Sequence, residues 1–144
     1  MSGFGCRILA SDIRENPSLK GLCTYVDNET LYKACDIISL HMPLLESTRH
    51  FVNAETIAKM KDGVTIINCA RGELMNIPDM IRGIETQKIG ALALDVFDKE
   101  DGIYHENRRD DILSNRDMAY LRQFPNVIMT QHMAFYTDAA VQSM

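Results

Sequence analysis

The sequence predicts an α/β fold in which helices flank a parallel β-sheet. Short apolar runs alternate along the chain with amphipathic stretches, which is typical of parallel strands joined by helical crossovers. Three of the later runs stop at polar loops that carry Arg71, Glu100 and His132. Ligands bind outside the carboxyl ends of the strands in open α/β sheets, so we expect these side chains to lie near one ligand. A cation, a carboxylate and an imidazole together can bind an acid and move a proton.

Strands and helices are expected in alternation along the chain. The apolar runs predict strands at Arg7–Ser11, Thr24–Val26, Asp36–Leu40, Val64–Asn68, Ala91–Leu94 and Val127–Met129. The amphipathic stretches predict helices at Glu29–Ala34, Ala54–Met60, Pro78–Thr86 and Met118–Phe124, with another beginning near Thr137. Asn28 and Asn53 are suited to cap the first two helices, and Gly90 is expected to break the chain before the fifth strand. The charged stretch from Asp98 to Asp117 predicts a long irregular loop, and its run Glu106–Asp111 predicts a solvated surface.

Composition is that of a globular protein of one domain. The chain has 144 residues, of which 46% are hydrophobic and 24% charged. A net charge of -5 argues against a nucleic-acid partner, which requires a clustered basic face. No apolar run reaches the ~18 residues of a membrane span, and the start of the chain lacks the pattern of a signal peptide. We therefore expect no membrane partner.

The four cysteines are irregularly spaced and do not match the ligand spacing of a zinc site. We expect no bound metal, and reduced thiols in a cytoplasmic protein. Cys6 and Cys69 lie within strand-like runs, which predicts that their side chains are buried.

Arg71 has two possible functions. Its guanidinium can bind a carboxylate through two parallel hydrogen bonds, or it can form a surface salt bridge. Ala70 and Gly72 beside it are small, which would let a ligand approach the backbone. The strand-end position favours a carboxylate site.

The acidic residues and His132 also have structural alternatives. Asp95, Asp98 and Glu100 can form a solvated acidic turn, or one of them can hold a histidine in one tautomer. Their spacing is not that of a calcium loop. His132 can have a structural role, or it can donate a proton. Imidazole suits the second role because its ordinary pKa of ~6.5 is close to neutral pH.

Asp12 follows the first predicted strand and is read in two ways. An acid at the end of the second strand of a dinucleotide-binding fold binds the adenosine ribose, whereas an aspartate can equally cap a turn. The glycine-rich turn that precedes such an acid has no room before position 12, since "SGFG" has no helix between it and the strand.

Four ordered segments resemble one family of enzymes. They are "DIISLHMPLLESTRHFVN", "MKDGVTIINCARGELMN", "ALALDVFDKE" and "NVIMTQHMAFYT". Together they resemble the NAD-dependent D-isomer-specific 2-hydroxyacid dehydrogenases, and the "HMAFYT" segment is most similar to the D-lactate and D-hydroxyisocaproate dehydrogenase branch. The resemblance runs from about Gly3 to the end of the chain. It implies a Rossmann-like fold that binds NAD.

The resemblance implies a role for each candidate residue. Arg71 matches the arginine that binds the substrate carboxylate, His132 the catalytic histidine and Glu100 the acid paired with it. Asp12 matches the ribose-binding acid, and Asp95 a residue at the nicotinamide end of the cofactor. The positions that match the lining of the cofactor cleft are Pro43, Thr48, Cys69 and Ala70.

The implied reaction reduces a 2-keto acid such as pyruvate to the D-2-hydroxy acid. NADH would deliver hydride to C2 while Arg71 clamps the carboxylate and polarises the ketone. His132 would protonate the developing alkoxide, with Glu100 holding its ring. Gln131 stands where a proline is most common before this histidine, which would change the stiffness of the loop more than its chemistry.

The resemblance also implies that the chain lacks the first strand–glycine turn–helix unit of the Rossmann-like domain. We expect residues 1–131 to form a partial dinucleotide-binding domain. Residues 132–144 would carry the catalytic-histidine loop and the start of a helix returning to an absent substrate domain. In the strand order 3-2-1-4-5-6 the missing strand is central, so Arg7–Ser11 and Asp36–Leu40 would lack the neighbour between them.

These expectations leave two functions open. The first is an oxidoreductase of which this chain is a part, inactive and weak in NAD binding when alone. The second is a catalytically silent remnant, or a dinucleotide-sensing interaction module, of the same fold. The exposed strand edges predict a homodimer or a rearranged sheet.

Overall fold

The computed structural model describes residues 2–104, 107 and 115–143. His105, expected in a loop, and most of the charged run Glu106–Asp111 lie outside these residues. The irregular stretch predicted from Asp98 to Asp117 is therefore described only at its two ends and at residue 107, and its last two residues belong to a helix.

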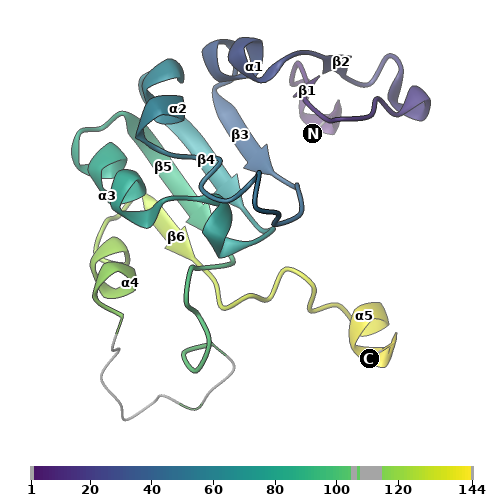
Figure 1. The fold of residues 1–144 in the computed structure, drawn as a ribbon. Helices are drawn as coiled ribbons and strands as arrows, with labels where there is room; N and C mark the ends of the chain where they lie inside the picture. The colour runs from purple at the N-terminus through teal and green to yellow at the C-terminus, as the bar shows by residue number, and fades with distance from the viewer. Residues whose placement is uncertain (1, 105–106, 108–114, 144) are drawn as a thin grey trace.

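Within the described residues, six parallel strands form two sheets (Figure 1). The smaller sheet pairs β1 (Leu9–Ala10) with β2 (Thr24–Tyr25). The larger sheet has the order β3-β4-β5-β6, with the strands β3 (Ile37–Leu40), β4 (Val64–Asn68), β5 (Ile89–Leu94) and β6 (Val127–Met129). The parallel α/β prediction is confirmed. Among the described residues no strand joins β1 to β3.

In the part of the chain that the structure describes, four helices lie in a row along one face of the larger sheet (Figure 1). They are α1 (Asn28–Ala34), α2 (Ala54–Lys59), α3 (Ile77–Glu85) and α4 (Arg116–Leu121). A fifth helix, α5 (Asp138–Ser143), has no buried residue and lies away from this row. Three short 3-10 helices lie at Ser2–Phe4, Pro17–Leu19 and Gly72–Leu74. No helix in the described part of the chain is long and apolar enough to cross a membrane.

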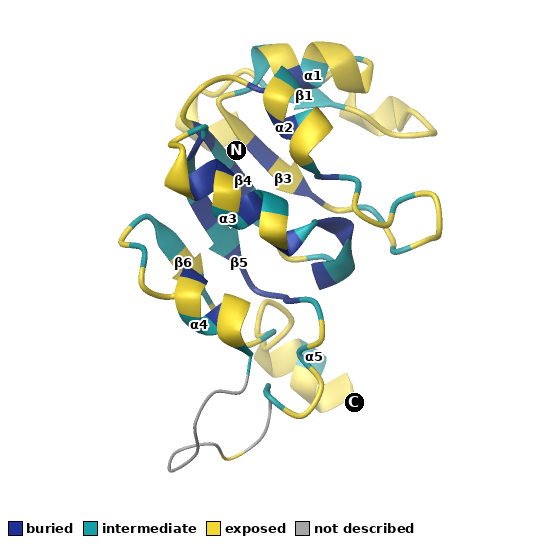
Figure 2. Cartoon of the chain, turned by 60° about the vertical axis from the view of Figure 1, so that its left-hand side comes forward, coloured by how far each residue is buried: buried dark blue, intermediate teal, exposed yellow. Residues whose placement is uncertain are grey.

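The core lies between the row of helices and the larger sheet (Figure 2). Alternation along β3 turns Ile38 and Leu40 toward the helices, while Ile37 on the opposite face is 47% exposed. The buried side chains of the helices include Met80, Ile84 and Leu121. Burying each such side chain contributes about 1.5–3 kcal/mol. One face of the sheet therefore carries most of the stabilisation.

The start of α1 and the start of β5 differ from the prediction. The N-cap of α1 is Asp27, whose carboxylate accepts a hydrogen bond from the N–H of Thr30 at 2.7 Å, and Asn28 is instead the first helical residue. Gly90 lies inside β5 rather than before it. A Cβ atom at Gly90 would lie 2.5 Å from the carbonyl oxygen of Gly63, so close approach of the chain entering β4 explains the glycine.

Two further sequence expectations concern a helix cap and the cysteines. Asn53 caps α2 as predicted, in a capping box that is completed by Thr56. The burial predicted for Cys6 and Cys69 is wrong, because both are exposed. Cys6 precedes the short strand β1, and Cys69 follows the last residue of β4, so neither side chain lies inside a sheet.

Candidate active site

Arg71, Glu100 and His132 all lie beyond the carboxyl ends of strands of the larger sheet. Arg71 follows β4, Glu100 follows β5 and His132 follows β6. Neighbouring parallel strands end at the same edge of a sheet, so the three loops begin side by side.

Glu100 and His132 form a hydrogen-bonded pair. The Nδ1 atom of His132 lies 2.5 Å from Oε1 of Glu100, and both side chains are partly buried. The second carboxylate oxygen of Glu100 accepts a hydrogen bond from the N–H of Phe97 at 2.7 Å, which fixes the carboxylate. The carboxylate therefore engages the imidazole at Nδ1 and holds the ring in one orientation. The phenyl ring of Phe135 contacts the imidazole edge-on, with centroids 6.2 Å apart.

Asp95 is buried and directed toward the loop that carries His132. Its side-chain oxygens accept hydrogen bonds from the hydroxyl of Thr130 and from the N–H groups of Met133 and Ala134. Burial acts to raise the pKa of Asp95, but these hydrogen bonds outweigh it and hold the pKa below its ordinary value. Asp95 is therefore a carboxylate at neutral pH.

The acidic residues Asp95, Asp98 and Glu100 do not act as one cluster. Asp95 holds the loop after β6, whereas Glu100 contacts the imidazole. Within residues 2–104, 107 and 115–143, no group of three or more His, Cys, Asp or Glu side chains is arranged to hold a metal ion.

Asn68 orders the loop of Arg71 and was missed in the sequence. It is completely buried at the end of β4. Its amide nitrogen donates to the carbonyl oxygen of Arg71 at 2.8 Å, and its amide oxygen accepts from the N–H of Ala70 at 3.0 Å. The guanidinium of Arg71 is exposed and donates to the carbonyl oxygen of Ala70 at 2.7 Å. A polar residue closing an otherwise apolar strand was the available signal.

Gly72 brings the Arg71 loop against the Glu100 loop. A Cβ atom at Gly72 would lie 2.1 Å from the carbonyl carbon of Phe97 and 2.4 Å from the nitrogen of Asp98. The sequence interpretation that Gly72 admits a ligand is therefore wrong, because main-chain atoms of the next loop fill the space.

Replacing Gly72 with alanine is expected to lower the free energy of unfolding by about 3 kcal/mol, because backbone cannot move aside as a side chain can. Urea denaturation of the chain measures the effect. Gly3→Ala is the matched control, since a Cβ atom at Gly3 would meet no other atom within 4 Å, and it should change stability by less than about 0.5 kcal/mol. Equal stabilities for the two variants would contradict the packing argument.

The side chain of Asp12 forms a turn contact, which is one of the two roles that the sequence left open for it. Its Oδ1 atom accepts a hydrogen bond from the N–H of Arg14 at 3.0 Å, and its side chain is exposed just beyond β1. This contact occupies one carboxylate oxygen and is compatible with ribose binding by the other.

The remaining predicted cofactor residues lie in the loops after β3 and β4. The hydroxyl of Thr48 donates to the carbonyl oxygen of Pro43 at 2.8 Å and accepts from the N–H of Leu45 at 2.8 Å, which closes the β3–α2 loop on itself. Cys69 and Ala70 immediately follow β4. All four positions thus belong to the same edge of the larger sheet as Arg71.

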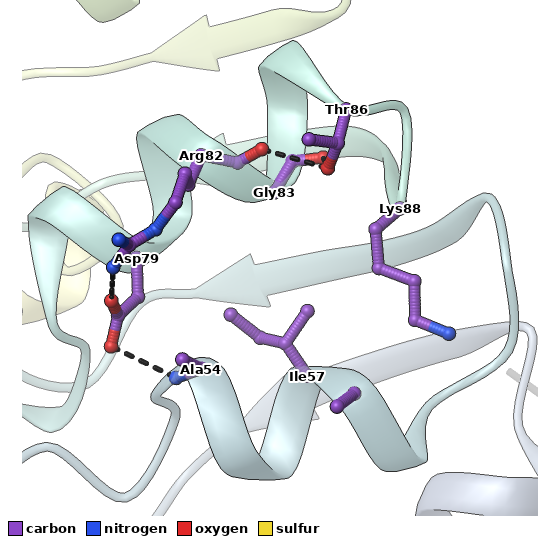
Figure 3. Close-up of a pocket in the computed structure, with 8 residues that line it drawn as sticks. Ala54, Ile57, Asp79, Arg82, Gly83, Thr86 and Lys88 are labelled. Atoms are coloured by element: carbon purple, nitrogen blue, oxygen red, sulfur yellow. Dashed lines mark hydrogen bonds and ion pairs between the residues drawn. The ribbon is translucent and has the colours of Figure 1, made fainter.

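A separate hollow of about 390 Å³ lies between α2, α3 and the turn after α3 (Figure 3). Asp79 binds Arg82 and accepts a hydrogen bond from the N–H of Ala54, while the ammonium of Lys88 pairs with Asp62 outside the hollow. Its lining residues are Ala54, Ile57, Ala58, Asp79, Arg82, Gly83, Thr86 and Lys88. None of the candidate site residues lines it.

The fold and the site define an α/β nucleotide-binding domain with an acid–imidazole pair at its ligand-binding edge. Residues 1–134 match the family model of the D-isomer specific 2-hydroxyacid dehydrogenase, NAD binding domain. The chain therefore belongs to the D-isomer specific 2-hydroxyacid dehydrogenase family, and nearly all of it matches the NAD-binding domain. The predictions of the family, the Rossmann-like fold and the NAD cofactor are confirmed.

Relatives and solved structures are similar over nearly the whole chain. The aromatic 2-oxoacid reductase of Clostridium sporogenes is 44% identical over 144 residues, covering 99% of the chain and 44% of the relative. The D-lactate dehydrogenase of Lactobacillus delbrueckii subsp. bulgaricus is 43% identical over 145 residues, covering 100% of the chain and 44% of the relative. A D-lactate dehydrogenase structure from Sporolactobacillus sp. has a TM-score of 0.94 at 34% identity, covering 99% and 43%. The D-lactate dehydrogenase of Lactobacillus jensenii, solved with NAD+, has a TM-score of 0.91 at 35% identity, covering 98% and 42%. The chain thus spans less than half the length of these proteins.

Proposed function

We propose that this chain supplies the NAD-binding half and the acid–base residues of an enzyme that reduces a 2-keto acid to a D-2-hydroxy acid. The contact between His132 and Glu100 carries the proposal, because a carboxylate that orients an imidazole at the ligand-binding edge of the sheet supports a role for that imidazole as proton donor. Arg71 lies on the neighbouring loop, where its guanidinium can bind the carboxylate of the substrate.

Three side chains divide the work of the proposed reaction. Arg71 clamps the substrate carboxylate and draws electron density from the adjacent ketone. His132, as imidazolium, donates its Nε2 proton to the ketone oxygen as negative charge develops there. Glu100 holds the ring in place through Nδ1. Bound NADH supplies the hydride for the carbonyl carbon.

The residues that we propose to hold the cofactor lie in loops that follow the carboxyl ends of strands. We assign the adenosine ribose to the exposed carboxylate of Asp12 beyond β1. The nicotinamide end is assigned to Asp95 beyond β5. The loop positions proposed to line the cleft between these ends are Pro43, Thr48, Cys69 and Ala70.

We propose that residues 1–131 belong to the dinucleotide-binding domain and that residues 132–144 lead toward a substrate domain. The chain alone is expected to bind NAD weakly and to be inactive. No strand among the described residues pairs with the second edge of β1 or of β3, which favours a homodimer. The four free cysteines suit the reducing cytoplasm.

A chimera tests the proposed function. Residues 1–144 would replace the matching segment of the Lactobacillus delbrueckii D-lactate dehydrogenase, and NADH oxidation would be followed with pyruvate and with phenylpyruvate. We expect turnover with at least one of them and a D-2-hydroxy acid as product, with the unaltered dehydrogenase as control. A folded chimera that binds NADH without turnover would favour the catalytically silent alternative.

Asp12 is expected to make this chimera prefer NADH to NADPH, because a carboxylate binds ribose hydroxyls and repels a 2′-phosphate. Asp12→Ala should reduce the ratio of kcat/KM for the two cofactors about 10-fold, which corresponds to one charged hydrogen bond. Asp117→Ala, an acid at the start of α4, is the control. An unchanged ratio in Asp12→Ala would leave Asp12 with its turn contact alone.

A further inference from the structure

We propose that Thr130 is a positioning residue that works with Asp95 to set the place of His132. Asp95 thereby gains a function in addition to the cofactor role proposed for it. The inference rests on the proposed function, since it explains how the proton donor of that reaction is held.

Asp95 contacts the His132 loop on both sides of the histidine. Its Oδ1 accepts from the hydroxyl of Thr130 at 2.5 Å and from the N–H of Met133 at 2.8 Å. Its Oδ2 accepts from the N–H of Ala134 at 2.7 Å. The main-chain oxygen of Asp95 accepts from the N–H of His132 itself at 2.6 Å. One residue therefore receives hydrogen bonds from four positions of the segment that follows β6.

The backbone at His132 needs this restraint. Its φ of 54° lies in the left-handed region, which residues other than glycine rarely adopt. Such a conformation persists only where the surroundings impose it. The hydrogen bonds from His132, Met133 and Ala134 to Asp95 provide those surroundings.

Asp95 is itself firmly placed. It is 4% exposed, and its N–H donates to the carbonyl oxygen of Asn68 at 3.0 Å, which ties it to β4. Because Asn68 also orders the Arg71 loop, the two strand-end residues link the positions of the proposed carboxylate-binding and proton-donating groups.

The position of His132 is thus set at two separate points. Glu100 fixes the imidazole ring through Nδ1, and Asp95 fixes the backbone from which the ring projects. The hydroxyl of Thr130 is the side-chain donor that orients the Asp95 carboxylate, whereas the N–H of Thr130 is already paired with the carbonyl oxygen of Leu94 at 2.8 Å. Replacing threonine with valine removes the hydroxyl and keeps both the shape and this main-chain contact.

Thr130→Val and Thr130→Ser, compared in the chimera, test the inference. Valine should lower kcat about 10-fold, since a small displacement of a catalytic group costs that much or more. Serine keeps the hydroxyl and should keep kcat within about 2-fold of the parent. The KM for the keto acid and the Kd for NADH should change less than about 2-fold in both variants, because Arg71 is not altered and Asp95 still accepts hydrogen bonds from the N–H groups of Met133 and Ala134. Thr130→Ala removes the hydroxyl with a smaller side chain and replaces the valine variant if circular dichroism shows that valine prevents folding.

The other outcomes overturn the inference. An unchanged kcat in Thr130→Val would show that the hydroxyl does not place His132. A loss of NADH affinity that accounts for the loss of rate would assign the contact to the cofactor. A lower melting temperature with full kcat would make the contact merely structural.

A readout without turnover separates this inference from the proposed function. The Nδ1 proton of His132 can be followed by NMR in the chimera with ¹⁵N-labelled histidine. Its resonance should shift or broaden in Thr130→Val and return in Thr130→Ser, whether or not the parent reduces a keto acid. An inactive parent that shows this pattern would contradict the proposed function alone, and a resonance unaffected by valine would contradict the positioning role alone.

Discussion

Replacing His132 with alanine is expected to lower the turnover of the chimera by ~100-fold or more. The imidazole is the group that we propose to protonate the ketone oxygen, and general acid catalysis of this kind contributes about 10²–10⁴-fold. Binding of NADH should persist, because the proposed cofactor residues lie on other loops. Steady-state kinetics and fluorescence titration with NADH measure the two effects.

The left-handed backbone at His132 calls for a second variant. Asparagine tolerates positive φ better than alanine does, so His132→Asn removes the imidazole with less backbone strain. His50→Asn is the matched control, since His50 also has positive φ, at 52°, and is not one of the proposed site residues. We expect full turnover in His50→Asn and the large loss in both His132 variants. Turnover within 2-fold of the parent in His132→Asn would remove His132 from the mechanism.

The second large effect is expected at Arg71. Arg71→Gln removes the charge and the two parallel hydrogen bonds to the substrate carboxylate, which should lower kcat/KM for the keto acid about 10²–10³-fold. Arg71→Lys keeps the charge without the planar fork and should lose about 10–100-fold. Substrate-dependent kinetics at saturating NADH measure these losses.

Arg82→Lys is the control for Arg71→Lys. Arg82 is also exposed and is paired with Asp79 on α3, away from the sheet edge. Its replacement should leave kcat/KM within about 2-fold. The same small effect in Arg71→Lys would show that Arg71 does not bind the carboxylate as a fork. A loss of NADH affinity in Arg71→Gln would place the arginine against the cofactor instead.

The strand ends were predictable because apolar runs and polar loops alternate so regularly. Val64–Asn68 and Val127–Met129 have the predicted bounds, since buried parallel strands leave a continuous apolar signature. Knowing where these strands end was enough to bring Arg71, Glu100 and His132 to one edge of a sheet. The pairing of Glu100 with His132 came from the resemblance, because nothing in the spacing of the two residues selects Glu100 over Asp98.

Other features depend on contacts that a sequence does not display. Positions 72 and 90 need glycine because main-chain atoms of a distant segment leave no room for a side chain. The roles that we predicted for Gly72 and Gly90 from the sequence were both wrong. Thr130 and Asn68 act through hydrogen bonds whose geometry exists only after the sheet has formed. Asp27 and Asn28 are adjacent residues that both suit a helix cap, and the entry angle of the chain decides between them.

The contact of Gly72 with the main chain of Phe97 and Asp98 also limits how this domain can be redesigned. The two loops meet without an intervening side chain, so neither has an adjustable layer that could absorb a change in the other. Altering substrate selectivity by grafting a foreign loop after β4 would therefore require its companion loop after β5 from the same donor. The two segments form one transferable module, and libraries that diversify them independently would consist mostly of misfolded combinations.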